Sequence, residues 1–210
     1  MNVFFTADPH YAHYNILRYT SRPWNNVDEM NEGLIKNWND TVPKGDSITY
    51  IVGDFAWKDH NKFLSRLNGK KVLIIGSHDH MSQEVYKNFT EVCINKMLKI
   101  DGKFYFLNHT CQRVWERSIH GVPHIFGHSH ARLETYNLSL DCGVDTKLAG
   151  FKPIHQTVID EDIERRKQMM QEMGRVNVEN GKTLYRQDDV NYWRFKAGIP
   201  PTQSVCPEGD

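Results

Sequence analysis

Short apolar and β-branched runs recur along the first two thirds of the chain, and Gly, Asp, Asn or Pro bounds each of them. Runs of this length and composition, closed by turn-forming residues, are typical of buried β-strands. We therefore predict strands over residues 3–7, 47–52, 71–75, 103–107, 124–126 and 137–140.

The segments between the first three of these strands repeat their apolar residues with the period of an α-helix. One apolar face is formed by Met30, Leu34, Ile35 and Trp38, and the other by Phe63, Leu64 and Leu67. Gly69 follows the second segment as a plausible helix stop. Because strands alternate with helices, the sequence predicts an α/β protein that begins β-α-β-α-β.

A hairpin signal follows the third strand. Two strand-like pieces, 96–100 and 103–107, flank the Asp101-Gly102 dipeptide, which is strongly preferred in tight hairpin turns. An antiparallel hairpin beside parallel strands makes a sheet mixed, so we expect a mixed sheet here.

The last part of the chain divides into a patterned and an irregular portion. A short strand over 154–159 is expected to lead into a helix over 160–173, with Gly174 at its end. Everything beyond is polar and irregular, apart from the apolar patch in "DDVNYWRF". We therefore predict one domain over residues 1–175 and an arm or lid over 176–210.

Composition excludes several classes of partner. The chain has 26 Lys and Arg against 26 Asp and Glu, so no overall field draws it to nucleic acid or to an anionic membrane. Hydrophobic residues make up 39% of the 210 residues, and no apolar run approaches the roughly 20 residues of a membrane helix. We expect no membrane partner, and the sequence indicates no particular oligomeric state.

The expected compartment follows from the start of the chain and from its thiols. The first predicted strand begins almost at Met1, which leaves no room for a secretory signal. Four cysteines without CxxC spacing predict reduced thiols rather than a disulfide framework or a zinc knuckle. We therefore expect a cytoplasmic protein.

Side chains that bind metals follow five predicted strands, at the point where each strand ends. They are Asp8 and His10, then Asp54, then Ser77, His78 and Asp79, then His109, and finally His128 and His130. Asp and Ser are ordinary turn residues, so at one strand end alone a structural role is the better interpretation. Turns do not require His, however, and the carboxyl ends of strands in an α/β sheet share one edge. We therefore expect these side chains to converge on one crevice.

The chemistry of this set indicates a pair of ions. Carboxylates and imidazoles without a thiolate suit borderline or hard divalent cations such as Mn²⁺, Fe²⁺ or Zn²⁺. One ion cannot use so many ligands, whereas two ions that share a carboxylate can. Two such ions form a clamp for in-line attack on phosphorus, so the pattern predicts a phosphoester hydrolase.

Five motifs in this order resemble those of the calcineurin-like metallophosphoesterases. They are "DPH" (8–10), "GD" (53–54), "GSHD" (76–79), "NH" (108–109) and "GHSH" (127–130). Each motif is common by itself, and the ordered set over residues 3 to about 145 carries the resemblance. The resemblance implies a four-layered α-β-β-α sandwich of two mixed sheets.

The resemblance also implies the ligands of two divalent ions. Asp8, His10 and His130 would hold one ion, His109 and His128 would hold the other, and Asp54 would bridge both. We expect Mn²⁺ first, with Fe²⁺, Zn²⁺ or Ni²⁺ as alternatives.

Residues 76–79 carry the implied acid and one departure from the family. His78 would protonate the leaving alkoxide or contact the phosphoryl oxygens, and Asp79 would orient its ring. Ser77 stands where the family has an Asn whose amide oxygen ligates the second ion. Either the shorter hydroxyl reaches the ion, or a water fills the gap, or the second site is weak, which is the interpretation we favour.

His13 and Arg22 are candidates for substrate binding. His13 follows the first ligands in a short loop and could contact a phosphate, although a solvent-facing imidazole fits equally well. Arg22, before Pro23-Trp24, could grip a phosphate with two hydrogen bonds, or it could pack on Trp24 as a surface residue.

We interpret the chain as a metal-dependent phosphoesterase, in the first place a phosphodiesterase that uses a metal-bridging hydroxide for in-line attack. The alternatives are a phosphomonoesterase for nucleotides or phosphoprotein, and a catalytically weakened metal-binding interaction protein in which Ser77 replaces the family's Asn. A small phosphodiester or nucleotide is a better substrate candidate than a nucleic-acid polymer. Trp115, between Arg113 and Arg117, could stack on a nucleobase, or it could pack inward.

Overall fold

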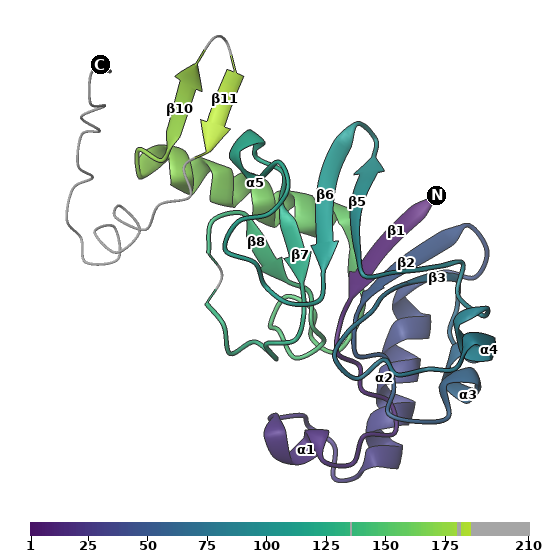
Figure 1. Cartoon of the computed structure of the whole chain (residues 1–210). Helices are drawn as coiled ribbons and strands as arrows, with labels where there is room; N and C mark the ends of the chain where they lie inside the picture. The colour runs from purple at the N-terminus through teal and green to yellow at the C-terminus, as the bar shows by residue number, and fades with distance from the viewer. Residues whose placement is uncertain (135, 180–181, 186–210) are drawn as a thin grey trace.

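The computed structural model describes residues 1–134, 136–179 and 182–185, which form an α/β fold with two mixed sheets (Figure 1). The five-stranded sheet has the order β4-β3-β2-β1-β9, and the four-stranded sheet has the order β5-β6-β7-β8. In the first sheet β9 is antiparallel to β1, and in the second β5 is antiparallel to β6, while the other pairs are parallel. The predicted α/β class and the mixed sheets are therefore confirmed.

The strands of the first sheet are β1 (Asn2–Thr6), β2 (Ser47–Val52), β3 (Lys70–Ile74), β4 (Glu91–Cys93) and β9 (Ile154–His155). Those of the second are β5 (Asn95–Ile100), β6 (Lys103–Asn108), β7 (His124–Phe126) and β8 (Ser139–Asp141). The helices are α1 (Ile16–Tyr19), α2 (Val27–Thr41), α3 (His60–Leu64), α4 (Gln83–Tyr86), α5 (Gln156–Glu172) and the 3₁₀ turn η1 (Ser118–His120).

Both faces of the five-stranded sheet are buried, because successive side chains of a strand point to opposite faces. In β1, Phe4 belongs to the core beneath α2 and α3, whereas Val3 and Phe5 belong to the core that includes the four-stranded sheet. The apolar face predicted for α2 lies in the first of these cores. Helices, the five-stranded sheet and the four-stranded sheet thus form successive layers.

Helix α5 packs on β1 and β9, and its residues Ile159 and Ile163 share a core with both sheets. Its Asp160 accepts a hydrogen bond from Tyr105 of β6. This packing does not confirm a fourth helical layer, so the four-layered order stays a prediction.

The structure differs from the predicted elements in several short segments. Residues 156–159 were expected to extend a strand, but they form the first turn of α5, whose N-cap is His155. The His155 side chain accepts a hydrogen bond from the Thr157 N–H, and this local cap outweighs the β-branched composition of the segment. Helix α3 ends at Leu64, before the predicted stop at Gly69.

Residues 176–185 begin the segment predicted to be an arm or lid. Strands β10 (Val176–Glu179) and β11 (Lys182–Tyr185) form an antiparallel hairpin, and Val176 and Tyr185 pack half-buried against the core. Residues 186–210 of the predicted arm lie outside the described residues. Among the helices in the described ranges, none combines the length and apolarity needed to cross a membrane.

The two sheets meet at the carboxyl ends of their strands. Beyond β1, the Ala7 N–H donates to the Cys142 carbonyl at 3.1 Å, and the Val144 N–H donates to the Ala7 carbonyl at 3.0 Å. This parallel bridge between Ala7 and Gly143 joins the end of β1 to the chain that leaves β8. The loops that follow strands of both sheets are thereby brought to one place.

Candidate metal centre

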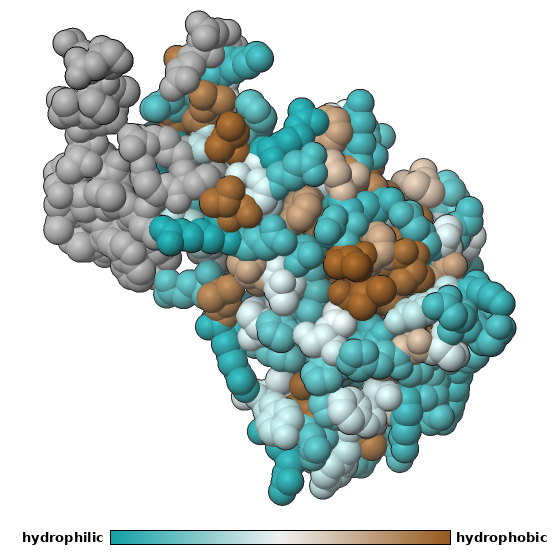
Figure 2. Space-filling view, in the orientation of Figure 1, coloured by the Kyte–Doolittle hydropathy of each residue, from teal (hydrophilic) through white to brown (hydrophobic). Residues whose placement is uncertain are grey.

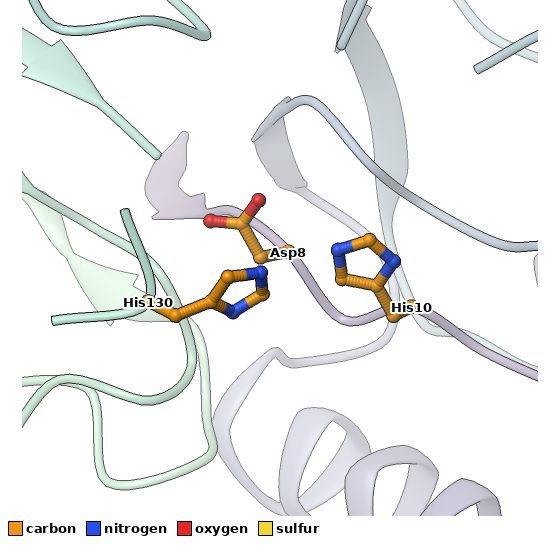
Figure 3. Close-up of side chains that lie close together, drawn as sticks. All are labelled: Asp8, His10 and His130. Atoms are coloured by element: carbon orange, nitrogen blue, oxygen red, sulfur yellow. The ribbon is translucent and has the colours of Figure 1, made fainter. Parts of the chain in front are cut away.

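One group of possible metal ligands consists of Asp8, His10 and His130. Asp8 and His10 follow β1, His130 follows β7, and their ligand atoms lie within 4.8 Å of one another. Figure 3 shows the side chains of Asp8, His10 and His130 close together. The sequence motifs assigned these three residues to one ion, and the structure brings them within reach of one.

A second group consists of Asp54, His109 and His128, which follow β2, β6 and β7. Their ligand atoms also lie within 4.8 Å of one another. Asp54 Oδ2 is 3.4 Å from His109 Nε2 in its own group and 3.4 Å from His10 Nε2 in the first group. Asp54 therefore lies between the two groups, and its role as a bridging carboxylate stays a prediction.

Hydrogen bonds at Nδ1 orient two of the imidazoles, those of His109 and His130. His109 Nδ1 lies 2.8 Å from the Val52 carbonyl oxygen, and His130 Nδ1 lies 2.7 Å from Asp145 Oδ2. Because both partners are acceptors, Nδ1 carries a proton in each ring, and in the neutral form of the ring Nε2 has a free lone pair. Metal-binding histidines are commonly held in this way.

Three ligand atoms are buried without a hydrogen bond to any described residue. They are Asp8 Oδ1, His10 Nε2 and His109 Nε2. A buried polar atom without a partner costs about 1–3 kcal/mol, so such atoms are rare in proteins. Two of these atoms belong to the first group and one to the second, so a cation at each group would supply the missing partners.

Burial and neighbouring groups shift the pKa values of the ligands. Burial raises the pKa of Asp8 to about 7 and lowers that of His10 to about 3. Burial alone would raise the pKa of Asp54 and lower that of His109. Their mutual attraction reverses both shifts, so the pKa of Asp54 lies below its usual range and that of His109 rises to about 9. The pair of Asp54 and His109 thus favours positive charge at the centre of the site, and a divalent cation held there would supply that charge while the imidazoles stay neutral.

The backbone at the site adopts a conformation that is uncommon for residues other than Gly. Five of the six ligand candidates have φ between 48° and 68°: Asp8, His10, Asp54, His128 and His130. Each such residue costs on the order of 1 kcal/mol, and strain of this kind concentrates at functional sites.

Ser77 and His78 are exposed at the edge of the two groups. Ser77 Oγ is 3.3 Å from Nδ1 of His128, which places the hydroxyl beside the second group. The His78 N–H donates to Asp54 Oδ1 at 2.8 Å, and its ring centroid is 5.5 Å from that of His10. The ring of His78 is thus beside the ligands without being one of them.

Asp79 has a different contact from the one predicted. Instead of orienting the ring of His78, its buried carboxylate accepts hydrogen bonds from the N–H groups of Asp54, Phe55 and Gly76, each at 2.8 Å. These three bonds use both oxygens and tie the loop after β2 to the loop after β3. Asp79 is therefore a positioning residue.

Arg22 also differs from its predicted role as a substrate contact. It is 7% exposed, and all of its N–H groups have partners inside the protein. It forms a two-bond pair with Asp145 and donates to the carbonyls of Asp8 and Pro9 and to the sulfur of Met30. No donor is left to grip a phosphate.

Asp145 was missed by the sequence analysis. It links Arg22 to His130, and it follows β8 in "DCGVD", as the other site residues follow their strands. Inspection of the end of the strand predicted over 137–140 leads first to Asp141 and only then, four residues further on, to Asp145.

A cleft of about 640 Å³ opens above the two groups. His13 is one of its lining residues, with Nδ1 3.3 Å from Nδ1 of His10, so its predicted contact with a phosphate stays a prediction. Trp115 does not reach this cleft, because it is 4% exposed and its Nε1 donates to the Val122 carbonyl.

The fold and the site define an α/β protein of two mixed sheets with paired candidate metal-binding groups at their common edge. The chain belongs to the same family as the uncharacterized protein MJ1445 of Methanocaldococcus jannaschii. The two are 30% identical over 175 residues, which cover 79% of this chain and 93% of that protein. No protein-family model matches the chain.

Two solved structures resemble the chain. The crystal structure of the protein of unknown function AQ665 from Aquifex aeolicus has a TM-score of 0.58 at 23% identity, over 76% of this chain and 98% of that chain. This likeness shows a shared fold. A structure of an archaeal phosphodiesterase has a TM-score of 0.44 at 19% identity, over 71% of this chain and 86% of that chain, and likeness at this level supports no conclusion about function.

Proposed function

We propose that this chain is a metal-dependent phosphoesterase of the calcineurin-like kind that hydrolyses phosphodiesters. The observation that carries the proposal is the position of Asp54, whose Oδ2 is 3.4 Å from His10 Nε2 and from His109 Nε2. A carboxylate between two ligand groups is suited to serve two cations, and two adjacent cations suit phosphoester hydrolysis.

The donor set fits a pair of divalent ions. Asp8, His10 and His130 would hold one ion, His109 and His128 would hold the other, and Asp54 would be shared. Carboxylates and imidazoles favour Mn²⁺, with Fe²⁺, Zn²⁺ or Ni²⁺ as competitors. When bound, such ions polarise a phosphoryl group and promote deprotonation of water.

The protein's own side chains position the substrate and handle the leaving group. The exposed ring of His78 stands at the cleft wall, where it can give a proton to the departing ester oxygen. Asp79 holds the loop that carries His78, and Asp145 holds His130 in the orientation that a ligand needs.

Charge favours a diester over a monoester. A phosphodiester carries one negative charge at neutral pH, whereas a phosphomonoester carries nearly two. Arg22 has no donor left for a phosphate, and among the described cleft residues only Lys58 and Arg132 have fixed positive charge. Beyond the ions, little protein charge is available for a second negative charge on the phosphoryl group.

The test is a comparison of bis-p-nitrophenyl phosphate with p-nitrophenyl phosphate, using protein stripped of metal and then loaded with Mn²⁺. We expect faster turnover of the diester, loss of turnover on chelation and recovery with Mn²⁺. Asp54→Asn should lower kcat at least about 100-fold, because one change affects both ions. Asp40→Asn, at an exposed carboxylate on α2, is the matched control.

Two outcomes separate the alternatives. Faster turnover of the monoester would favour the phosphomonoesterase. Binding of two ions without turnover of either ester would favour the interaction protein, for which Ser77 beside His128 is the supporting feature.

A further inference from the structure

The cleft above the candidate metal groups has an aromatic wall. Trp57, Tyr14 and Tyr19 line it, and their side chains are 53%, 63% and 57% exposed. Large aromatic side chains are usually more buried than this, so three of them around one cleft need an explanation. Figure 1 places α1, which ends at Tyr19, beyond the carboxyl end of β1.

Trp57 is held in place on one face and open on the other. The His13 ring stacks on it with a centroid distance of 4.5 Å and an interplanar angle of 10°. The His78 ring lies at its side, with a centroid distance of 5.6 Å and an angle of 49°. An exposed fraction of 53% leaves the remaining indole surface accessible next to the proposed acid.

Positive charge stands at the rim of the same cleft. Lys58 and Arg132 are exposed lining residues, although the whole chain has a net charge of zero. The Arg132 guanidinium donates to the Tyr19 carbonyl, which fixes it beside the aromatic wall, and Lys58 has no ion pair among the described residues. Figure 2 shows the end of the molecule around α1 mostly in teal and white, so this surface is not an apolar docking face.

We propose that the cleft takes a nucleoside phosphodiester, with the nucleobase stacked on Trp57 and the phosphodiester over the candidate metal groups. A flat nucleobase can stack on the exposed face of the Trp57 indole. Base stacking on an aromatic side chain is a common source of affinity for nucleotides. Lys58 and Arg132 complement the negative charge of such a ligand. An alkyl diester would leave the aromatic wall without a partner.

The hydrolytic step rests on the proposed function. Water adds to phosphorus and loses one proton to the solvent, the bond from phosphorus to the leaving oxygen breaks, and that oxygen takes a proton from His78, which the solvent then reprotonates. The products are a nucleoside monophosphate and an alcohol.

The kinetic test uses Mn²⁺-loaded full chain and two diesters with the same leaving group: p-nitrophenyl thymidine 5′-phosphate and p-nitrophenyl methyl phosphate. We expect kcat/KM to favour the nucleoside ester by about 10-fold or more, mainly through KM. Trp57→Ala should remove most of this preference, and Trp57→Phe should retain much of it. Ile94→Ala, at a side chain 70% exposed outside the cleft, should leave the preference as it is.

A binding measurement separates this inference from the proposed function. Calorimetric titration of the Mn²⁺-loaded protein with thymidine 5′-monophosphate and with ribose 5-phosphate should show tighter binding of the nucleotide, lost in Trp57→Ala. If neither diester is hydrolysed but this difference is present, the hydrolase proposal fails and the stacking site stands. If both diesters react equally and both phosphates bind equally, the stacking site is refuted and the hydrolase proposal stands.

Discussion

Asp145 connects two side chains from distant parts of the sequence. Its Oδ1 accepts from Arg22 Nε at 2.8 Å, and its Oδ2 accepts from Arg22 Nη2 at 2.9 Å and from His130 Nδ1 at 2.7 Å. Burial alone would raise the pKa of Asp145, but Arg22 and His130 lower it to about 2. The carboxylate is therefore ionised at neutral pH and keeps the proton of His130 on Nδ1.

We predict that Asp145→Asn weakens binding of the first Mn²⁺ about 10- to 100-fold, because the amide can donate to His130 Nδ1 and favour the wrong tautomer. Calorimetric titration of metal into the variant would measure the change. Asp46→Asn, at an exposed carboxylate that pairs with the N-terminus, is the control. Unchanged affinity for both ions would show that Asp145 does not position His130.

For single residues, the sequence predicted the position of a side chain relative to a strand better than it predicted the partners of that side chain. The ligand candidates follow strands, and a strand end can be read from apolar runs, so Asp8, Asp54 and His109 could be located without coordinates. The partners of Arg22 could not be predicted from the sequence, because they depend on which loop folds over this side chain. The exposure of Trp57 depends in the same way on packing between segments distant in sequence.

The turn after β2 shows how closely the elements approach one another. Gly53 has φ +90°, and a Cβ atom placed on it would lie 2.1 Å from His109 Nδ1 and 2.8 Å from the Cα of Gly76. The loops after β2, β3 and β6 thus meet at one residue without a side chain. Any larger residue must push His109 away from the Val52 carbonyl that orients it.

We predict that Gly53→Ala lowers the free energy of unfolding by about 2–5 kcal/mol, the sum of left-handed strain and overpacking. Gly102→Ala is a matched control, because Gly102 also has a positive φ, +83°, but has open space around its Cα. Urea unfolding of both variants would measure the difference. Equal losses would mean that crowding at His109 contributes nothing.

Elements with a clear apolar pattern could be predicted more reliably than elements without one. The strands at 47–52 and 103–107 and the apolar face of α2 follow clear periods, whereas α1, α4 and β4 have only three or four residues each. So few residues do not establish a period, and packing decides their conformation. The start of α5 was assigned wrongly for a local reason, the side-chain cap at His155.

Over the whole molecule, each proposed ion would connect the two sheets. Asp8, His10 and Asp54 follow strands of the five-stranded sheet, and His109 and His130 follow strands of the four-stranded sheet. A cation held from both sides resists separation of the sheets in addition to the backbone bridge at Ala7. The layered order of the sheets could not be predicted from any single segment, because it depends on how the two sheets are paired.

We predict that chelation lowers the melting temperature by about 5–10 °C. An ion present at 100 times its Kd stabilises the folded state by about 2.7 kcal/mol, and each kcal/mol shifts Tm by about 2–4 °C in a chain of this size. Scanning calorimetry with and without EDTA, followed by addition of Mn²⁺, would measure the shift. An unchanged Tm after complete metal removal would contradict a metal centre that spans the sheets.

The bridge between Ala7 and Gly143 has a consequence for biosynthesis. Asp8 and His10 leave the ribosome early, but the chain that locks the end of β1 in place is translated more than a hundred residues later. A shorter nascent chain contains Asp8 and His10 but lacks the residues that hold the end of β1 in place. The groups proposed to hold cations would therefore be complete only after translation has passed Gly143.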